Sequence, residues 1–83
     1  MVNMAVIGRT AFTRNEEYRE LLLYQDGSTF RVWEVIGSPK DAERVQRKQI
    51  ALAGSQTEAK GQFEKEGERL RSEGFSNCDP LAA

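Results

Sequence analysis

Histidine is absent from this 83-residue chain, and cysteine occurs only once, at Cys78. Histidine is the commonest general base and metal ligand in proteins, because its side chain ordinarily titrates near neutral pH. Without it there is no Ser-His-Asp triad, no Cys-His pair and no histidine zinc site, and one cysteine cannot form a thiolate zinc cluster. We therefore expect a protein that is not an enzyme, with no catalytic residues, no cofactor and no metal site.

Long apolar runs are also missing. The longest hydrophobic stretch, residues 21–24, is far shorter than the roughly 18 residues of a membrane span. The N-terminus lacks the basic-then-apolar pattern of a secretory signal. A single cysteine cannot form an internal disulfide, whereas small secreted domains usually need disulfides. These absences favour a cytoplasmic protein with no membrane contact.

Charge of neither sign dominates, because 12 basic and 13 acidic side chains give a net charge of −1. This balance argues against strong nonspecific binding to nucleic acid, which depends on the local number of cations. One basic cluster is nevertheless present around residues 40–48, and its alternative interpretation is an ordinary solvated surface. The candidate nucleic-acid-binding residues are Arg31, Lys40, Arg44, Arg47 and Lys48. Residues that extend the set, if the first strand lies nearby, are Arg9, Arg14 and Arg19.

The length allows one domain, and a composition of 39% hydrophobic and 30% charged residues is typical of globular proteins. Residues 3–13 predict a first strand with a bulge at Gly8, and residues 14–17 a polar connection. Residues 18–25 and 30–36 predict two further strands. Asp26-Gly27 lies between them and predicts a hairpin, because glycine accepts the positive φ of a tight turn.

Residues 42–53 fit two different structures. Ser38 as N-cap and Pro39 at the first helical position would begin a helix well, and most of the following residues are good helix formers. Residues 49–53, bounded by Gly54, also fit a further strand. Propensity alone favours the helix by a small margin.

Residues 55–73 predict a helix. Ser55 and Glu58 have the spacing of a capping box, in which the serine side chain accepts a hydrogen bond from the backbone three residues later. Three apolar side chains then share one helical face: Ala59, Phe63 and Leu70. We expect this face to pack on the sheet.

Glycines inside and after this helix carry further information. Gly61 and Gly67 each weaken an isolated helix by about 1 kcal/mol relative to alanine, so packing must hold the helix, and glycine can also allow a strand to approach closely. Gly74 followed by Phe75 is typical of a left-handed C-cap with its hydrophobic contact. We expect one domain over residues 1–75 and a disordered tail over residues 76–83.

Residues 18–75 resemble the WGR domain, a family named for a Trp-Gly-Arg motif and found in DNA-dependent poly(ADP-ribose) polymerases and in free-standing bacterial proteins. The resemblance follows the family's first strand and turn, its second strand with a Trp, the motif glycine, a later strand, and an Ala-x3-Phe helix with a Gly-aromatic ending. The matching residues are Tyr18, Leu21, Leu22, Asp26, Phe30-Arg31-Val32-Trp33, Gly37, residues 51–54, Ala59, Phe63, Lys65, Leu70, Gly74 and Phe75.

The motif itself is replaced here by Ile36-Gly37-Ser38. In the family, the motif's aromatic ring and arginine serve nucleic-acid end recognition and contacts between domains, and a serine hydroxyl does not replace a planar guanidinium. The resemblance therefore supports a fold more than a function. It also implies a strand that ends near Gly54. We place this strand over residues 48–53, with residues 39–47 as a connecting loop containing one helical turn.

We predict an α+β fold: a small antiparallel sheet of about four strands, with one C-terminal helix packed on one face. The leading hypothesis for function is a non-enzymatic, WGR-like binding module that contacts nucleic acid or a nucleic-acid-processing protein. In this hypothesis Trp33, otherwise a core aromatic, is a stacking platform. The alternative is a protein-interaction or inhibitor module, such as a small accessory or phage-type regulator, acting through an exposed sheet edge. The apolar first strand, residues 3–13, is also a candidate for pairing two copies in a homodimer.

Overall fold

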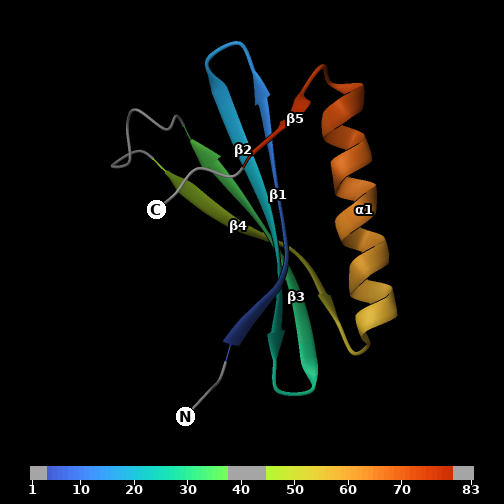
Figure 1. The fold of residues 1–83 in the computed structure, drawn as a ribbon. Helices are drawn as coiled ribbons and strands as arrows, with labels where there is room; N and C mark the ends of the chain where they lie inside the picture. The colour runs from blue at the N-terminus through green and yellow to red at the C-terminus, as the bar shows by residue number, and fades with distance from the viewer. Residues whose placement is uncertain (1–3, 38–44, 80–83) are drawn as a thin grey trace.

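A computed structural model describes residues 4–37 and 45–79 of the chain. The described elements are β1 (Met4–Arg14), β2 (Glu17–Asp26), β3 (Thr29–Gly37), β4 (Gln46–Ala53), α1 (Gln56–Ser72) and β5 (Ser76–Cys78). They form an antiparallel five-stranded sheet in the order β4-β3-β2-β1-β5, with α1 along one side of it (Figure 1). The α+β fold is therefore confirmed, and the described sheet has one strand more than the expected four.

Two tight turns connect the first three strands. Gly27 has φ 63°, so the Asp26-Gly27 hairpin is confirmed. The connection expected over residues 14–17 is shorter, since β1 runs to Arg14 and Asn15 takes a positive φ of 55°. The register of β1 against β2 shifts between Val6 and Gly8, which confirms the bulge. The residue that the bulge leaves without a Cα partner in β2 is Ile7.

Residues 46–53 form a strand, so the strand interpretation of this segment holds and the helix favoured by propensity does not form. β4 begins two residues earlier than expected and pairs with β3 from Ile36 to Phe30. Gly37 contributes to this pairing, because a Cβ there would lie only 2.9 Å from Cγ2 of Val45. Of the connecting loop with one helical turn expected over residues 39–47, residues 39–44 lie outside the described residues, and residues 46 and 47 belong to β4 instead. Ladder hydrogen bonds and burial of Ala53 outweigh the weak helix propensity.

The helix begins and ends as the sequence predicts. The Ser55 side chain accepts a hydrogen bond from the Glu58 backbone N–H at 3.2 Å. At the other end Gly74 has φ 97°, and the Phe75 N–H donates to the Leu70 carbonyl at 3.0 Å. This left-handed ending reverses the chain, so that the residues after Phe75 run back beside the sheet.

Residues 76–78 are consequently not part of a tail. They form β5, which pairs with residues 11–13 of β1. Asn77 fixes this strand in place, since its side chain donates to Thr10 Oγ1 at 3.2 Å and accepts from Arg71 Nε at 2.9 Å. A three-residue strand carries too little pattern to be recognised in sequence. Of the predicted tail, residues 80–83 lie outside the described residues.

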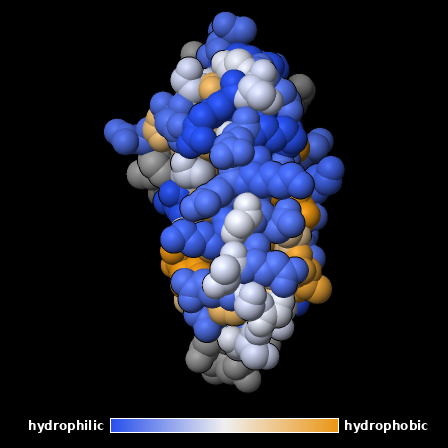
Figure 2. All heavy atoms as spheres, turned by 90° about the vertical axis from the view of Figure 1, so that its right-hand side faces the viewer, coloured by the Kyte–Doolittle hydropathy of each residue, from blue (hydrophilic) through white to orange (hydrophobic). Residues whose placement is uncertain are grey.

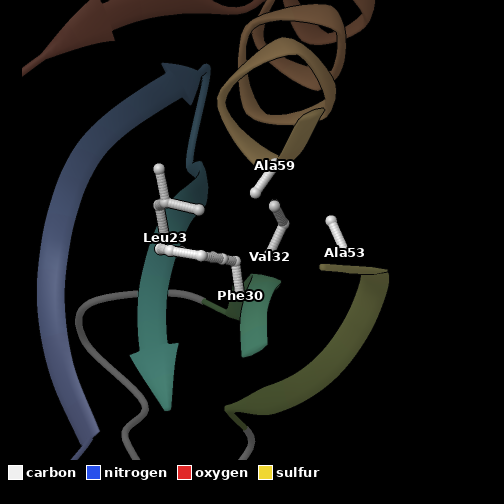
Figure 3. Packing of buried hydrophobic residues seen from close by; sticks show 5 residues of the cluster. All are labelled: Leu23, Phe30, Val32, Ala53 and Ala59. Atoms are coloured by element: carbon white, nitrogen blue, oxygen red, sulfur yellow. The ribbon is translucent and has the colours of Figure 1, made fainter. Parts of the chain in front are cut away.

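The hydrophobic core lies between the sheet and α1. One buried cluster, under the first turns of α1, consists of Leu23, Phe30, Val32, Ala53 and Ala59 (Figure 3). A second, under the last turns, consists of Phe12, Leu21, Leu70 and Phe75. Gly67 is buried, and a Cβ there would lie 3.4 Å from the Phe12 ring, whereas a Cβ at Gly61 would meet open space.

The solvent side of α1 is hydrophilic, and hydrophobic atoms appear mainly at its margins (Figure 2). No helix in the described part of the chain has the length and hydrophobicity needed to cross a membrane. The helix is thus amphipathic, and its apolar stripe is buried against the sheet.

Candidate functional site

The side of the sheet opposite α1 is the candidate site. Because side chains alternate along a strand, β2 and β3 present one set of residues to the helix and another to the far side. We call this far side the open face, since no described helix or strand lies over it. Its central residues are Leu22, Tyr24, Trp33, Val35 and Arg47.

The open face is unusual in its composition. An antiparallel sheet with one covered face commonly presents polar side chains on the other. Here, however, Leu22 lies directly opposite Trp33, and Tyr24 lies next along β2 on the same side. These side chains are only half-buried, so the face is apolar and still accessible. Such a surface is typical of a binding site.

Two shallow hollows adjoin on this face. The first, of about 200 Å³, is lined by the five central residues. The second, of about 360 Å³, shares most of them and extends towards β1, where it also meets Val6, Arg9 and Glu20. Both are too shallow to enclose a small molecule on all sides, so the surface suits a flat or extended ligand.

Trp33 is the central aromatic residue of this surface. It lies in the middle of β3, between Leu22 of β2 and Gln49 of β4. Its indole Nε1 is buried and has no hydrogen-bond acceptor among the described residues. A buried donor without an acceptor is uncommon in folded proteins, so the indole N–H of Trp33 is an exception that calls for an explanation.

Three arginines surround the aromatic centre, and two of them already have acidic partners. Arg31 lies 3.4 Å from the Asp26 carboxylate and donates to Gln49 Oε1 at 3.0 Å. Arg9 forms an ion pair with Glu20, and this hydrogen-bonded carboxylate raises the pKa of the guanidinium. Glu20 is itself buried.

Arg47 differs from the other two, because it lines both hollows and has no ion-pair partner among the described residues. Its register position opposite Val35 places it on the open face. Among the described arginines of this face, Arg47 is thus the one most available to an anionic ligand.

The predicted contact residues separate in the structure. Arg31 and Arg47 lie on the open face, whereas Lys48 lies opposite Glu34, on the side of the sheet that α1 covers. The other two candidates, Lys40 and Arg44, lie outside the described residues.

The arginines proposed to extend the cluster also separate. Arg9 lines the second hollow. Arg14 and Arg19 instead lie over the ring of Phe75, at 4.5 and 5.2 Å from its centre, beneath the end of the helix. Only Arg9 therefore joins the open face.

Sequence reasoning missed the apolar floor formed by Leu22, Tyr24 and Val35. The available signal was the run of four consecutive apolar residues at 21–24. Such a run implies that both faces of a strand are apolar, but it does not say that one of them lacks a cover.

Within the described residues, no group of three or more acidic or cysteine side chains is placed to hold a metal ion. Comparison with family models, with curated proteins and with solved structures found no match for this chain. Any inference about function therefore rests on the chemistry of the open face.

Proposed function

We propose that this chain is a non-enzymatic binding module that holds a single-stranded segment of nucleic acid on its open face. The observation that carries the proposal is the accessible aromatic centre of Trp33 and Tyr24 next to the guanidinium of Arg47, which has no ion-pair partner among the described residues. The proposal keeps the WGR-like binding module expected from the sequence. It moves the contact from the cluster at residues 40–48 to the sheet.

Stacking supplies the sequence-tolerant part of the binding. Every base has a flat π face, and a base stacked on an aromatic side chain contributes about 1–3 kcal/mol. Trp33 and Tyr24 are both half-buried in a shallow hollow, so each ring is held by the sheet and still accessible. Leu22 and Val35 extend the apolar floor beneath the bases.

Phosphate contacts supply the electrostatic part. Arg9, Arg31 and Arg47 lie around the aromatic centre, against two carboxylates, Glu20 and Asp26. The local excess is one positive charge, so we expect modest affinity. With three phosphate contacts on a single strand, the logarithm of the affinity falls with the logarithm of the salt concentration at a slope of about −2.

A single strand fits this surface better than a duplex. In a duplex each base face is covered by its neighbours, so an aromatic platform has nothing to stack on. The element that could enter a major groove, α1, lies on the opposite side of the sheet.

The test is a fluorescence-anisotropy titration with a labelled oligothymidine and oligouridine of about 12 nucleotides, which span the site of a single-strand-binding domain. Trp33→Ala should weaken binding about 5- to 150-fold through loss of one stacked base, while Trp33→Phe should retain most of it. A duplex of the same length should bind more weakly than either single strand.

The matched control is a pair of neighbouring basic residues on opposite faces. Arg47→Ala should weaken binding and make the salt slope shallower by about 0.7, whereas Lys48→Ala should leave both unchanged. Equal effects of the two substitutions, or no binding to any of the oligonucleotides at low salt, would rule out the open face as a nucleic-acid site.

A further inference from the structure

The second hollow of the open face contains an acidic side chain. Glu20 is only 8% exposed, yet it lines this hollow beside Leu22 and Val35. A buried carboxylate is costly unless it is hydrogen-bonded, and two partners hold this one. Arg9 Nε donates to one carboxylate oxygen, and the Tyr18 hydroxyl donates to the other at 2.9 Å. The hollow therefore has a negatively charged acceptor fixed in its wall.

Glu20 keeps acceptor capacity for a ligand. An ionised carboxylate only accepts hydrogen bonds, and its two oxygens offer about four lone-pair sites. Two hydrogen bonds reach Glu20 from the described residues, one on each oxygen. Each oxygen can therefore accept a further bond from an N–H that enters the hollow. A phosphate is excluded from this position, because it has the same sign of charge as the carboxylate.

The strand register places Glu20 next to the aromatic centre. Leu22 lies opposite Trp33, and Glu20, two residues before Leu22 on the same face, lies opposite Val35. Glu20 and Trp33 are thus diagonal neighbours on adjacent strands, which lie about 7–8 Å apart. The first hollow contains Trp33 and the second contains Glu20, and Leu22 and Val35 belong to both. A base stacked on Trp33 in the first hollow therefore has an edge within reach of the Glu20 carboxylate.

We propose that Glu20 makes the open face select bases that carry an exocyclic amino group, such as cytosine and adenine. The selection rests on the proposed function, since it concerns a base already stacked on Trp33. An amino N–H donates to the carboxylate, in the way that cytosine N4 pairs with acidic side chains. Thymine and uracil have no amino group. Their single ring N–H lies between two carbonyl oxygens, which the negative charge of Glu20 repels.

Two DNA strands of about 12 nucleotides test this selection by fluorescence anisotropy at low salt and about pH 8. One contains only thymine and the other only 5-methylcytosine. Both bases carry the methyl group, and they differ in the carbonyl or amino group at C4 and in the proton on N3. The wild-type protein should bind the methylcytosine strand about 5-fold or more tightly, the lower end of what a good base contact provides. Equal affinity, or tighter binding of thymine, would overturn the selection.

Glu20→Gln separates the charge of this side chain from its shape. The amide keeps the size of the carboxylate, but it can donate to the thymine carbonyl, and a negative charge near the phosphates is lost. The variant should bind the two strands with similar affinity, and the thymine strand more tightly than the wild-type protein does. Glu34→Gln changes the buried carboxylate on the side of the sheet that α1 covers, so this control should keep the wild-type ratio. An unchanged ratio in Glu20→Gln would contradict the role of Glu20.

A modified strand gives a second readout with the unaltered protein, and it does not depend on how well a variant folds. The base 2-pyrimidinone has the ring, N3 and carbonyl group of cytosine but no amino group. A strand of this base should therefore bind as weakly as the thymine strand. Binding as tight as that of the methylcytosine strand would show that the amino group is not what the protein reads.

The outcomes also distinguish the base selection from the proposed function. Equal binding of all three strands, weakened by Trp33→Ala, would contradict the selection and leave the open face as a nucleic-acid site. Failure of every strand to bind at low salt would contradict the proposed function, and the selection with it.

Discussion

The two faces of the sheet use the same strands for different purposes. On the helix face, Phe12, Leu21 and Val32 are fully buried. On the open face, the alternate residues Leu22 and Trp33 are only half-buried, although they are as apolar as their neighbours. Burial stabilises in proportion to the apolar area removed from water, so the helix face holds the fold together and the open face contributes less. The proposed binding role gives these accessible apolar residues a purpose other than holding the fold.

Each face also contains one buried carboxylate, and the partners differ. Glu34 on the helix face lies 3.2 Å from Arg69 of α1 and 3.7 Å from Arg19. Glu20 on the open face is held by Arg9 of β1 and by the hydroxyl of Tyr18 at 2.9 Å. Glu34 thus ties the helix to the sheet, whereas Glu20 ties strands to one another.

The largest expected difference between the faces is in stability. Phe12→Ala removes a fully buried ring beneath α1 and should cost about 3–5 kcal/mol, a large part of the total stability of a chain this size. Leu22→Ala, on the same sheet but half-buried, should cost about 1 kcal/mol. Urea unfolding followed by circular dichroism measures both. Equal losses would mean that the open face is also part of the core.

A smaller effect separates the two carboxylates. Glu34→Gln should destabilise the fold by about 1–2 kcal/mol. The loss is limited because Arg69 keeps Glu66 and Glu73, each at 2.7 Å, as alternative partners. Native-state hydrogen exchange should show faster opening of α1. Glu20→Gln should speed exchange in β1 and β2 and leave α1 unchanged. Faster exchange of α1 in both variants would contradict the separate roles.

The fold could be predicted largely because local signals agreed with one another. Ser55, Gly74 and the Asp26-Gly27 turn each fixed an element boundary by backbone chemistry, and the structure uses all three. β4 was harder, because residues 42–53 have helix propensity. The strand forms through pairing with β3 and close approach at Gly37, which are contacts distant in sequence.

The candidate site could be predicted only in part. Arg31, Arg47 and Trp33 were recognisable as residue types suited to nucleic acid, but grouping Arg47 with Lys48 was wrong in space. Adjacent residues on a strand point to opposite faces, so a basic cluster in sequence is divided by the sheet. The apolar floor is accessible because no second helix covers it in the described part of the chain, and the sequence of β2 alone does not show this.

The smallest expected effect concerns Cys78, at the edge of the sheet. The reactivity of its thiol indicates whether the charge of Glu20 on the open face acts on β5. Cys78, Ala11 and Glu20 lie side by side across β5, β1 and β2. Burial, together with the negative charges of Asp79 and Glu20, raises the pKa of the Cys78 thiol. The folded state therefore disfavours the thiolate, so this group's contribution to stability is present below the unfolded pKa of about 8.5 and is lost as pH rises above it.

The same pKa shift should slow alkylation, since the thiolate is the reactive form. At pH 8 iodoacetamide should modify Cys78 several-fold more slowly in the folded chain than in urea, where the shift is abolished. Glu20→Gln should raise the folded rate slightly, because it removes a negative charge that stands across β1 from the sulfur. Glu34→Gln, which changes the charge on the other face, should leave the rate unchanged. If Glu34→Gln accelerated the reaction as much as Glu20→Gln, the two faces would not be electrostatically separate.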